Sequence, residues 1–177
     1  SDPLIVHDMV RCVMCGRCVR ACSELRGVNA LTFVRKGENL MVGTPGGVTL
    51  ADAGCKFCGA CVEVCPTGSI RDQLSVFEKH ASRRGALVPC RETCPAGIDI
   101  PRYIRFVKEG DGGSALAVVR EKVPFPGTLG LICDHPCEHD CRRGVVNESV
   151  AIRNIKRYAA EHDDGAWKLK GYRKEPT

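Results

Sequence analysis

Eight cysteines repeat one spacing twice along this chain. The runs are Cys12, Cys15, Cys18, Cys22 and then Cys55, Cys58, Cys61, Cys65, each reading C-x2-C-x2-C-x3-C, with Pro66 after the second. In two-cluster ferredoxins, three thiolates of one run and the fourth of the other run hold each [4Fe–4S] cluster. The spacing therefore predicts electron transfer through two clusters. One is held by Cys12, Cys15, Cys18 and Cys65, and the other by Cys55, Cys58, Cys61 and Cys22.

A third ligand set is predicted from the five remaining cysteines, Cys90, Cys94, Cys133, Cys137 and Cys141. The last three have the spacing C-x3-C-x3-C, which places their thiols towards one side of a helix or tight loop. A fourth thiolate from Cys94 or Cys90 would complete a cluster. Pro95 follows Cys94 as Pro66 follows Cys65, so Cys94 is the predicted ligand and Cys90 is spare.

Disulfides and zinc are the alternatives for so many cysteines. Residues 1–11 contain no apolar core of signal-peptide length, the count of 13 is odd, and the spacings suit metal ligands, which all weigh against disulfides. Three cysteines within seven residues also overcrowd one tetrahedral zinc ion. His135 and His139 lie among the last cysteines and keep zinc open for the third set.

Composition limits the class of protein. A chain of 177 residues forms one or two domains, and no stretch reaches the roughly 18 apolar residues of a membrane span, so a cytoplasmic protein is expected. The hydrophobic fraction of 44% includes the cysteines, and only 5% of residues are aromatic. Because metal binding contributes folding free energy, bound clusters would compensate for this thin core.

The net charge of +5 does not indicate nucleic-acid binding. Twelve ligand thiolates and three oxidised cubane cores would bring the charge of the loaded protein to about −1. The basic residues therefore offset the clusters.

The first domain is predicted to cover residues 1–80. Gly16 and Gly59 recur inside the two cysteine runs, where the lack of a Cβ lets the backbone curl around a cluster. Strand-like segments at residues 30–34 and 40–43 flank Gly37-Glu38-Asn39 and predict a β-hairpin. Leu74, Phe77 and Ala81 then follow helical spacing up to the predicted boundary.

The second domain, residues 81–177, is predicted to be all-α, which makes the whole chain α+β. Apolar periodicity predicts helices over residues 99–109, 114–122 and 149–161, with Asp99 as an N-cap. The segment Gly110 to Ala115 matches G-x-G-x-x-A, but a predicted helix precedes it where the dinucleotide fingerprint needs a strand. A turn between two helices is the better interpretation, and no nucleotide site is expected.

The first 80 residues resemble the two-cluster ferredoxin modules of complex electron-transfer enzymes such as iron hydrogenases and formate dehydrogenases. The resemblance rests on Cys12-Val-Met-Cys-Gly-Arg-Cys-Val-Arg-Ala-Cys22 and on Gly27-Val-Asn-Ala-Leu-Thr-Phe-Val34.

The second half is similar to the N-terminal helical cluster domain of the glutamate synthase small subunit and dihydropyrimidine dehydrogenase. The matching segments are Cys94-Pro-Ala-Gly-Ile-Asp-Ile-Pro101, Pro124-Phe-Pro126 and Cys133 to Arg143. Those domains carry two clusters, one of which uses an upstream C-x2-C pair that this chain lacks. The resemblance implies one cluster on Cys94, Cys133, Cys137 and Cys141, with Cys90 matching a ligand of the absent cluster. The flavin and pyridine-nucleotide domains of those enzymes are not expected here.

The combination of both modules resembles the electron-transfer subunit of tungsten-dependent, class II benzoyl-coenzyme A reductases of strict anaerobes. This resemblance implies a non-catalytic subunit with three [4Fe–4S] clusters. It would pass low-potential electrons from a ferredoxin or a flavoprotein to a larger, tungsten-containing catalytic subunit. Two alternatives stay open. One is the electron-input portion of an NAD(P)H-dependent flavoenzyme complex, and the other is a structural zinc-binding interaction module.

Overall fold

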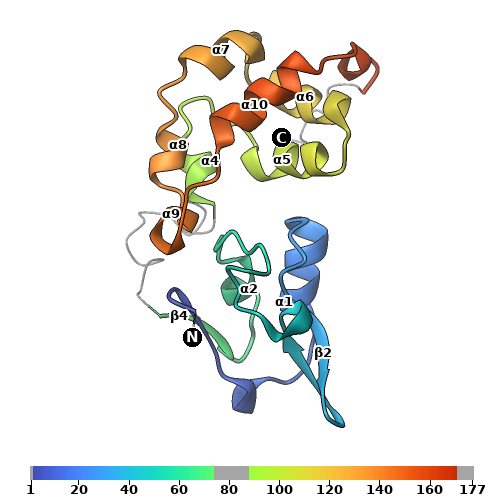
Figure 1. Cartoon of the computed structure of the whole chain (residues 1–177), viewed down its shortest axis with the longest axis vertical. Helices are drawn as coiled ribbons and strands as arrows, with labels where there is room; N and C mark the ends of the chain where they lie inside the picture. Colours follow the sequence, from blue (N-terminus) through green and yellow to red (C-terminus); the bar gives the residue numbers. More distant parts are fainter. Residues whose placement is uncertain (1, 74–87, 171–177) are drawn as a thin grey trace. The chain divides into compact units, whose positions relative to one another are not determined.

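The chain folds as two compact units in a computed structural model that describes residues 2–73 and 88–170 (Figure 1). The first unit comprises Ser1–Pro89 together with Arg142–Glu148, and the second comprises Cys90–Cys141 together with Ser149–Thr177. The predicted boundary between residues 80 and 81 lies outside the described residues, as does the helical pattern of Leu74, Phe77 and Ala81.

The strands in the described part of the first unit form two small antiparallel sheets. Strand β1 (Ile5–His7) pairs with β4 (Ile70–Asp72), so that sequence-distant strands lie together with His7 opposite Ile70. Strands β2 (Thr32–Lys36) and β3 (Asn39–Gly43) form the predicted hairpin. Its turn is shorter than expected, because Lys36 already pairs with Asn39 and Gly37 takes the left-handed backbone with φ of 63°.

The helices in the described part of the first unit are short. They are η1 (Met9–Arg11), α1 (Arg17–Arg20), the π-helix η2 (Ala21–Leu25), η3 (Pro45–Gly47), α2 (Ala60–Glu63) and α9 (Arg143–Val146). Helices α1 and α2 lie within the two cysteine runs. Helix α1 runs directly into η2, so one continuous helical segment carries Cys18 and Cys22.

The core of the first unit is built around its cysteines. Ala30, Val42 and Phe57 are at most 1% exposed and pack in one cluster with Cys18 and Cys55. Cys18 and Cys55 are therefore structural parts of the hydrophobic interior.

Segment 142–148 reaches the first unit although it follows most of the second unit in sequence. Val146 of α9 packs against the core that contains Phe57 and Cys55. No sequence pattern indicated this return, because the segment is short and largely polar.

The second unit is helical throughout its described residues. Its elements are α4 (Pro89–Thr93), α5 (Ile100–Lys108), α6 (Gly112–Arg120), α7 (Pro126–Ile132), α8 (Pro136–His139), α10 (Ile152–Glu161) and η5 (Ala166–Lys168). The three predicted helices are confirmed as α5, α6 and α10. Helix α7 contains two glycines and a threonine among its seven residues, lacks a clear apolar period and was not predicted. The α+β interpretation agrees with these helices and the two small sheets.

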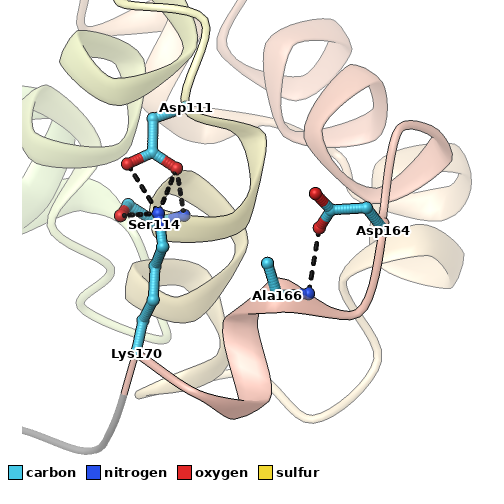
Figure 2. Close-up of polar contacts among 5 residues, drawn as sticks. All are labelled: Asp111, Ser114, Asp164, Ala166 and Lys170. Atoms are coloured by element: carbon cyan, nitrogen blue, oxygen red, sulfur yellow. Dashed lines mark hydrogen bonds and ion pairs between the residues drawn. The ribbon is translucent and has the colours of Figure 1, made fainter.

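Carboxylates define several of the helix starts. Asp99 Oδ1 accepts from the Arg102 amide at 3.4 Å, and Asp111 Oδ1 accepts from the Ser114 amide at 2.9 Å. The Asp111 cap moves the start of α6 two residues ahead of the prediction. Lys170 Nζ also reaches both Asp111 oxygens, at 2.6 and 2.8 Å, and thereby fastens the segment after η5 to α6 (Figure 2).

Helix α10 joins the helices of the second unit into one core (Figure 1). Tyr103 of α5 is 0% exposed, and its hydroxyl donates to the Ile152 carbonyl at 2.9 Å. Gly130 of α7 lies against α10, where an added Cβ would come 2.8 Å from the Arg157 Cβ. Glycine is needed there for the close approach. Within the described ranges, no helix has the length and apolar character needed to cross a bilayer.

Candidate metal centre

Two cavities in the first unit bring its eight cysteines together in two groups of four. One cavity is lined by Cys12, Cys15, Cys18 and Cys65, and the other by Cys22, Cys55, Cys58 and Cys61. Each group combines three thiols of one run with the last thiol of the other. The two cavities are of similar size, about 310 and 370 Å³ with open solvent included. This grouping matches the exchange of fourth ligands expected of a two-cluster ferredoxin.

All thirteen cysteines are free thiols, and they differ in exposure. Cys15 is exposed, whereas Cys18, Cys55 and Cys137 are buried. The first cavity therefore has the most solvent-accessible thiol of the chain.

Burial makes several of these thiols hard to ionise. It raises the pKa of Cys55 to about 12 and that of Cys61 well above its ordinary value, and nearby thiols such as Cys58 add to both shifts. A positively charged iron core would compensate the thiolates, so ligation releases protons that the metal-free protein retains. Cys65 differs: its pKa is lowered, because hydrogen bonds from Ile70 and Thr67 outweigh its small desolvation.

Left-handed glycines begin the helix after each ligand loop. Gly16 precedes α1 with φ of 71°, and Gly59 precedes α2 with φ of 81°. A Cβ on Gly16 would lie 3.1 Å from Phe33 Cζ, so both conformation and space favour glycine. The predicted role of these glycines in curling the backbone agrees with their geometry.

A second backbone feature appears at all three cysteine sets. Met14, Phe57 and His135 have φ of 55°, 50° and 44°, and each lies two residues after a cysteine. The Phe57 amide donates to Cys55 Sγ at 3.3 Å, and the His135 amide donates to Cys133 Sγ at 3.4 Å. Left-handed backbone costs a residue with a Cβ roughly 1–2 kcal/mol. The chain therefore accepts the same local strain at three cysteine loops, and at two of them the strained residue donates its amide to the thiol.

The third set lies in the second unit. Burial raises the pKa of Cys137 to about 11, and charges on Cys94 and Cys133 add to the shift, so these three thiols are close together. Cys141 follows Cys137 after one helical turn, and its Sγ accepts from the Val150 amide at 3.5 Å. Cys90 lies in the same surroundings, since Cys90 and Cys94 both pack against the buried cluster that contains Tyr103 and Cys137. Burial raises the pKa of Tyr103, and the thiols of Cys137, Cys90 and Cys94 add to this shift.

The two histidines of the third set contact each other, with ring centroids 5.5 Å apart in an edge-on arrangement. In the part of the chain that the structure describes, no three His, Cys, Asp or Glu side chains are close enough to hold a single metal ion. A cubane has iron at four corners, so its thiolates lie farther apart than the ligands of one ion.

Two buried side-chain nitrogens further test whether the cavities fit iron–sulfur clusters. His7 Nε2 and Arg26 Nε have no hydrogen-bond partner, and these residues line the first and second cavity respectively. The ligand loops of iron–sulfur clusters commonly direct N–H groups at sulfur. Clustered thiols, amides aimed at them and unpaired donors all fit [4Fe–4S] groups.

The family comparisons match two separate regions of the chain. Residues 2–71 match the ferredoxin-like domain of NADH-quinone oxidoreductase subunit 3, and residues 79–166 match dihydropyrimidine dehydrogenase domain II, a 4Fe–4S cluster domain. Most of the chain is therefore similar to ferredoxin-like and 4Fe–4S cluster domains.

Individual relatives are subunits of oxidoreductases. The beta subunit of NADP(+)-dependent formate dehydrogenase from Moorella thermoacetica is 47% identical over 75 residues, which is 42% of this chain and 11% of the relative. The NADPH-Fe(3+) oxidoreductase beta subunit of Geobacter sulfurreducens is 44% identical over 75 residues, again 42% of this chain and 11% of the relative. The NADP-reducing hydrogenase subunit HndD of Solidesulfovibrio fructosivorans is 36% identical over 74 residues, 42% of this chain and 13% of the relative.

The chain spans roughly a tenth of the length of these relatives. The similarity thus concerns an iron–sulfur module within much larger proteins. All three relatives are named for reactions that involve NADP or NADPH.

Proposed function

We propose that this chain relays single electrons through three [4Fe–4S] clusters within an NAD(P)H-dependent oxidoreductase complex. The observation that carries the proposal is the strained left-handed residue two positions after Cys12, Cys55 and Cys133. One loop geometry at three cysteine sets supports one kind of cofactor at all three.

Each set of side chains has a defined task in this proposal. The first cavity supplies Cys12, Cys15, Cys18 and Cys65; the second supplies Cys55, Cys58, Cys61 and Cys22; the third set is Cys94, Cys133, Cys137 and Cys141. When bound, each cluster accepts and releases one electron at a time. Phe57 and Val42 are buried in the same cluster as Cys18 and Cys55 and help to shield these two thiols from water.

The protein itself is proposed to be a non-catalytic subunit or module, so a larger partner would carry out the reaction. The relatives' names support an NAD(P)H-linked partner more than a tungsten benzoyl-coenzyme A reductase. The tungsten enzyme stays a narrower prediction from sequence resemblance.

Anaerobic purification followed by iron and sulfide analysis tests the cofactor content. Three clusters give about twelve of each per chain. About eight would contradict the third cluster, and zinc with eight iron atoms would support a hybrid protein. Broad absorbance near 400 nm, bleached by dithionite, is expected, and a colourless protein containing zinc alone would overturn the proposal.

The subunit that accompanies the chain through purification tests the partner. A flavoprotein that reduces the clusters with NADH or NADPH supports the proposed complex. A tungsten or molybdenum subunit without pyridine-nucleotide activity would favour the benzoyl-coenzyme A reductase prediction instead.

A further inference from the structure

Two residues that line different cysteine cavities of the first unit each carry a buried side-chain nitrogen without a hydrogen-bond partner. These nitrogens are His7 Nε2 and Arg26 Nε. Leaving a buried donor unpaired costs about 1–3 kcal/mol, and folded proteins pair the great majority of such groups. Because each cavity has one such nitrogen on a lining residue, we expect each cavity to bind a group that accepts hydrogen bonds.

His7 belongs to the first cavity. It ends strand β1, opposite Ile70 of β4, and lines the cavity together with Cys12, Cys15 and Cys65. Burial lowers the pKa of its imidazole, against the opposing influence of Asp8, so the ring is neutral near pH 7. A neutral imidazole carries one N–H, which is available for donation at the buried position in the Nε2-protonated tautomer.

Arg26 belongs to the second cavity. It follows the π-helix η2 directly and lines the cavity with Cys22, Cys55 and Cys61. A guanidinium keeps its charge under all physiological conditions, so this residue brings both a positive charge and an N–H donor to the thiols.

We propose that His7 Nε2–H and Arg26 Nε–H donate hydrogen bonds to sulfur atoms of the first and second cluster, and thereby raise the reduction potential of each. The inference rests on the proposed function, since it concerns how the same clusters are tuned. Reduction adds one electron and breaks no bond. The extra negative charge strengthens a hydrogen bond from N–H to sulfur, so the donor stabilises the reduced state more than the oxidised state.

The two donors should differ in strength. His7 offers a neutral dipole, whereas Arg26 adds a full charge within a partly desolvated cavity, where charge interactions are less screened than in water. Arg26 should therefore raise the potential of the second cluster more than His7 raises that of the first. The two donors together should therefore favour reduction of the cluster held by Cys55, Cys58, Cys61 and Cys22.

Redox titration monitored by EPR tests the proposal on the full chain. His7→Phe removes the N–H and keeps an aromatic ring, and Arg26→Met removes the N–H and the charge and keeps a long side chain. His7→Phe should lower the potential of the first cluster alone, and Arg26→Met that of the second alone. Loss of one hydrogen bond should change the one-electron equilibrium constant about tenfold, which equals about 59 mV. Cys15→Ser and Cys58→Ser identify which EPR signal belongs to which cluster.

Conservative variants and remote variants serve as controls. His7→Gln keeps an N–H donor and should retain most of the wild-type potential. Arg35→Met on the hairpin and His162→Phe in the second unit should leave both potentials unchanged, because neither residue lines a cysteine cavity.

The outcomes separate this inference from the proposed function. Loaded clusters with unchanged potentials in both variants would overturn the inference and leave the relay function standing. Wild-type protein that binds no clusters would overturn both. If a variant fails to load, pulsed EPR of wild-type protein labelled with ¹⁵N-histidine or ¹⁵N-arginine gives a second measurement. Nitrogen coupling to the reduced clusters supports the hydrogen bonds, and its absence contradicts them.

Discussion

The guanidinium of Arg143 donates to the backbone carbonyl of Cys55, a cysteine that lies far earlier in the sequence. Its Nη1 also donates to the Ala51 carbonyl at 3.0 Å, while its Nε donates to Asn147 Oδ1 at 2.7 Å. Arg142 adds a longer contact of 3.5 Å from Nη1 to the Cys58 carbonyl. A segment that follows the third cysteine set thus holds the loop that presents the second cysteine run.

Arg143→Gln should weaken this loop. Hydrogen bonds to a charged donor contribute about 1.5–3 kcal/mol, and both carbonyls lose that donor in the variant. Iron bound at Cys55, Cys58 and Cys61 should therefore be lost to a chelator several-fold faster than in the wild type, measured as decay of absorbance near 400 nm.

Two control variants test whether the rate of iron loss depends on the guanidinium of Arg143. Arg143→Lys keeps the charge without the planar fork and should show an intermediate rate. Arg35→Gln, on the exposed hairpin, should match the wild type. Equal rates for Arg143→Gln and wild type would contradict a holding role for Arg143.

Tyr103→Phe should destabilise the second unit through a single atom. The hydroxyl is buried and bonds the Ile152 carbonyl, which ties α5 to the start of α10. Removing it leaves a buried carbonyl without this donor, at a cost of about 1–2 kcal/mol. Calorimetry should show a lower unfolding midpoint, by roughly 4–8 °C per kcal/mol for a unit of this size. Tyr158→Phe is the control, since Tyr158 is 50% exposed and should shift the midpoint little.

Lys170→Met tests the contact between Asp111 and the segment after η5. The hydrogen bond from Lys170, followed by those from Ser114, lowers the Asp111 pKa from 3.8 to about 2. A lowered carboxyl pKa contributes stability above the unfolded value, and this stability is lost only as the pH falls from about 4 towards 2. The side chains of Asp111 and Lys170 are 36% and 39% exposed, so solvent screening keeps the loss within about 1 kcal/mol.

The expected difference in unfolding midpoint between Lys170→Met and wild type is therefore small and constant from pH 8 to pH 5.5. It should shrink as salt screens the ion pair. A difference that varies with pH inside this window would assign the effect to a group other than Asp111.

Local patterns in the sequence predicted the regular elements well. Alternating and β-branched residues around Gly37 indicated the hairpin, and the i, i+3, i+4, i+7 spacing of Ile100, Tyr103, Ile104 and Val107 indicated α5. Both signals are carried by neighbouring residues, which is why they can be read without tertiary contacts.

Features that depend on tertiary contacts were not predictable. The pairing of β1 with β4 joins two three-residue strands more than 60 positions apart, and such short strands have no usable period. The left-handed conformation of Met14 and Phe57 also leaves no mark in composition, because neither residue favours it. A search of the sequence for glycine alone misses these two positions.

Single-cysteine variants test the exchange of fourth ligands between the two cysteine runs. Cys22→Ala should damage the cluster held by Cys55, Cys58 and Cys61, because Cys22 lines their cavity rather than that of its sequence neighbours. Cys65→Ala should damage the cluster held by Cys12, Cys15 and Cys18 for the same reason. EPR spectra of the reduced variants measure which signal is lost, and loss of the sequence-adjacent cluster in both cases would reject the exchange.

The same approach separates Cys94 from Cys90 in the second unit. Charges on Cys94 and Cys133 both act on Cys137, so Cys94→Ala should abolish the third cluster and lower the iron content by about four atoms. Cys90→Ala should keep all three clusters. It is the matched control, because Cys90 lies in the short helix α4 and Cys94 follows the end of that helix directly. The reverse result would assign the fourth ligand to Cys90. Because Cys90 and Cys94 both pack against the buried residues around Tyr103, either assignment keeps the iron–sulfur cluster beside the core that contains α5.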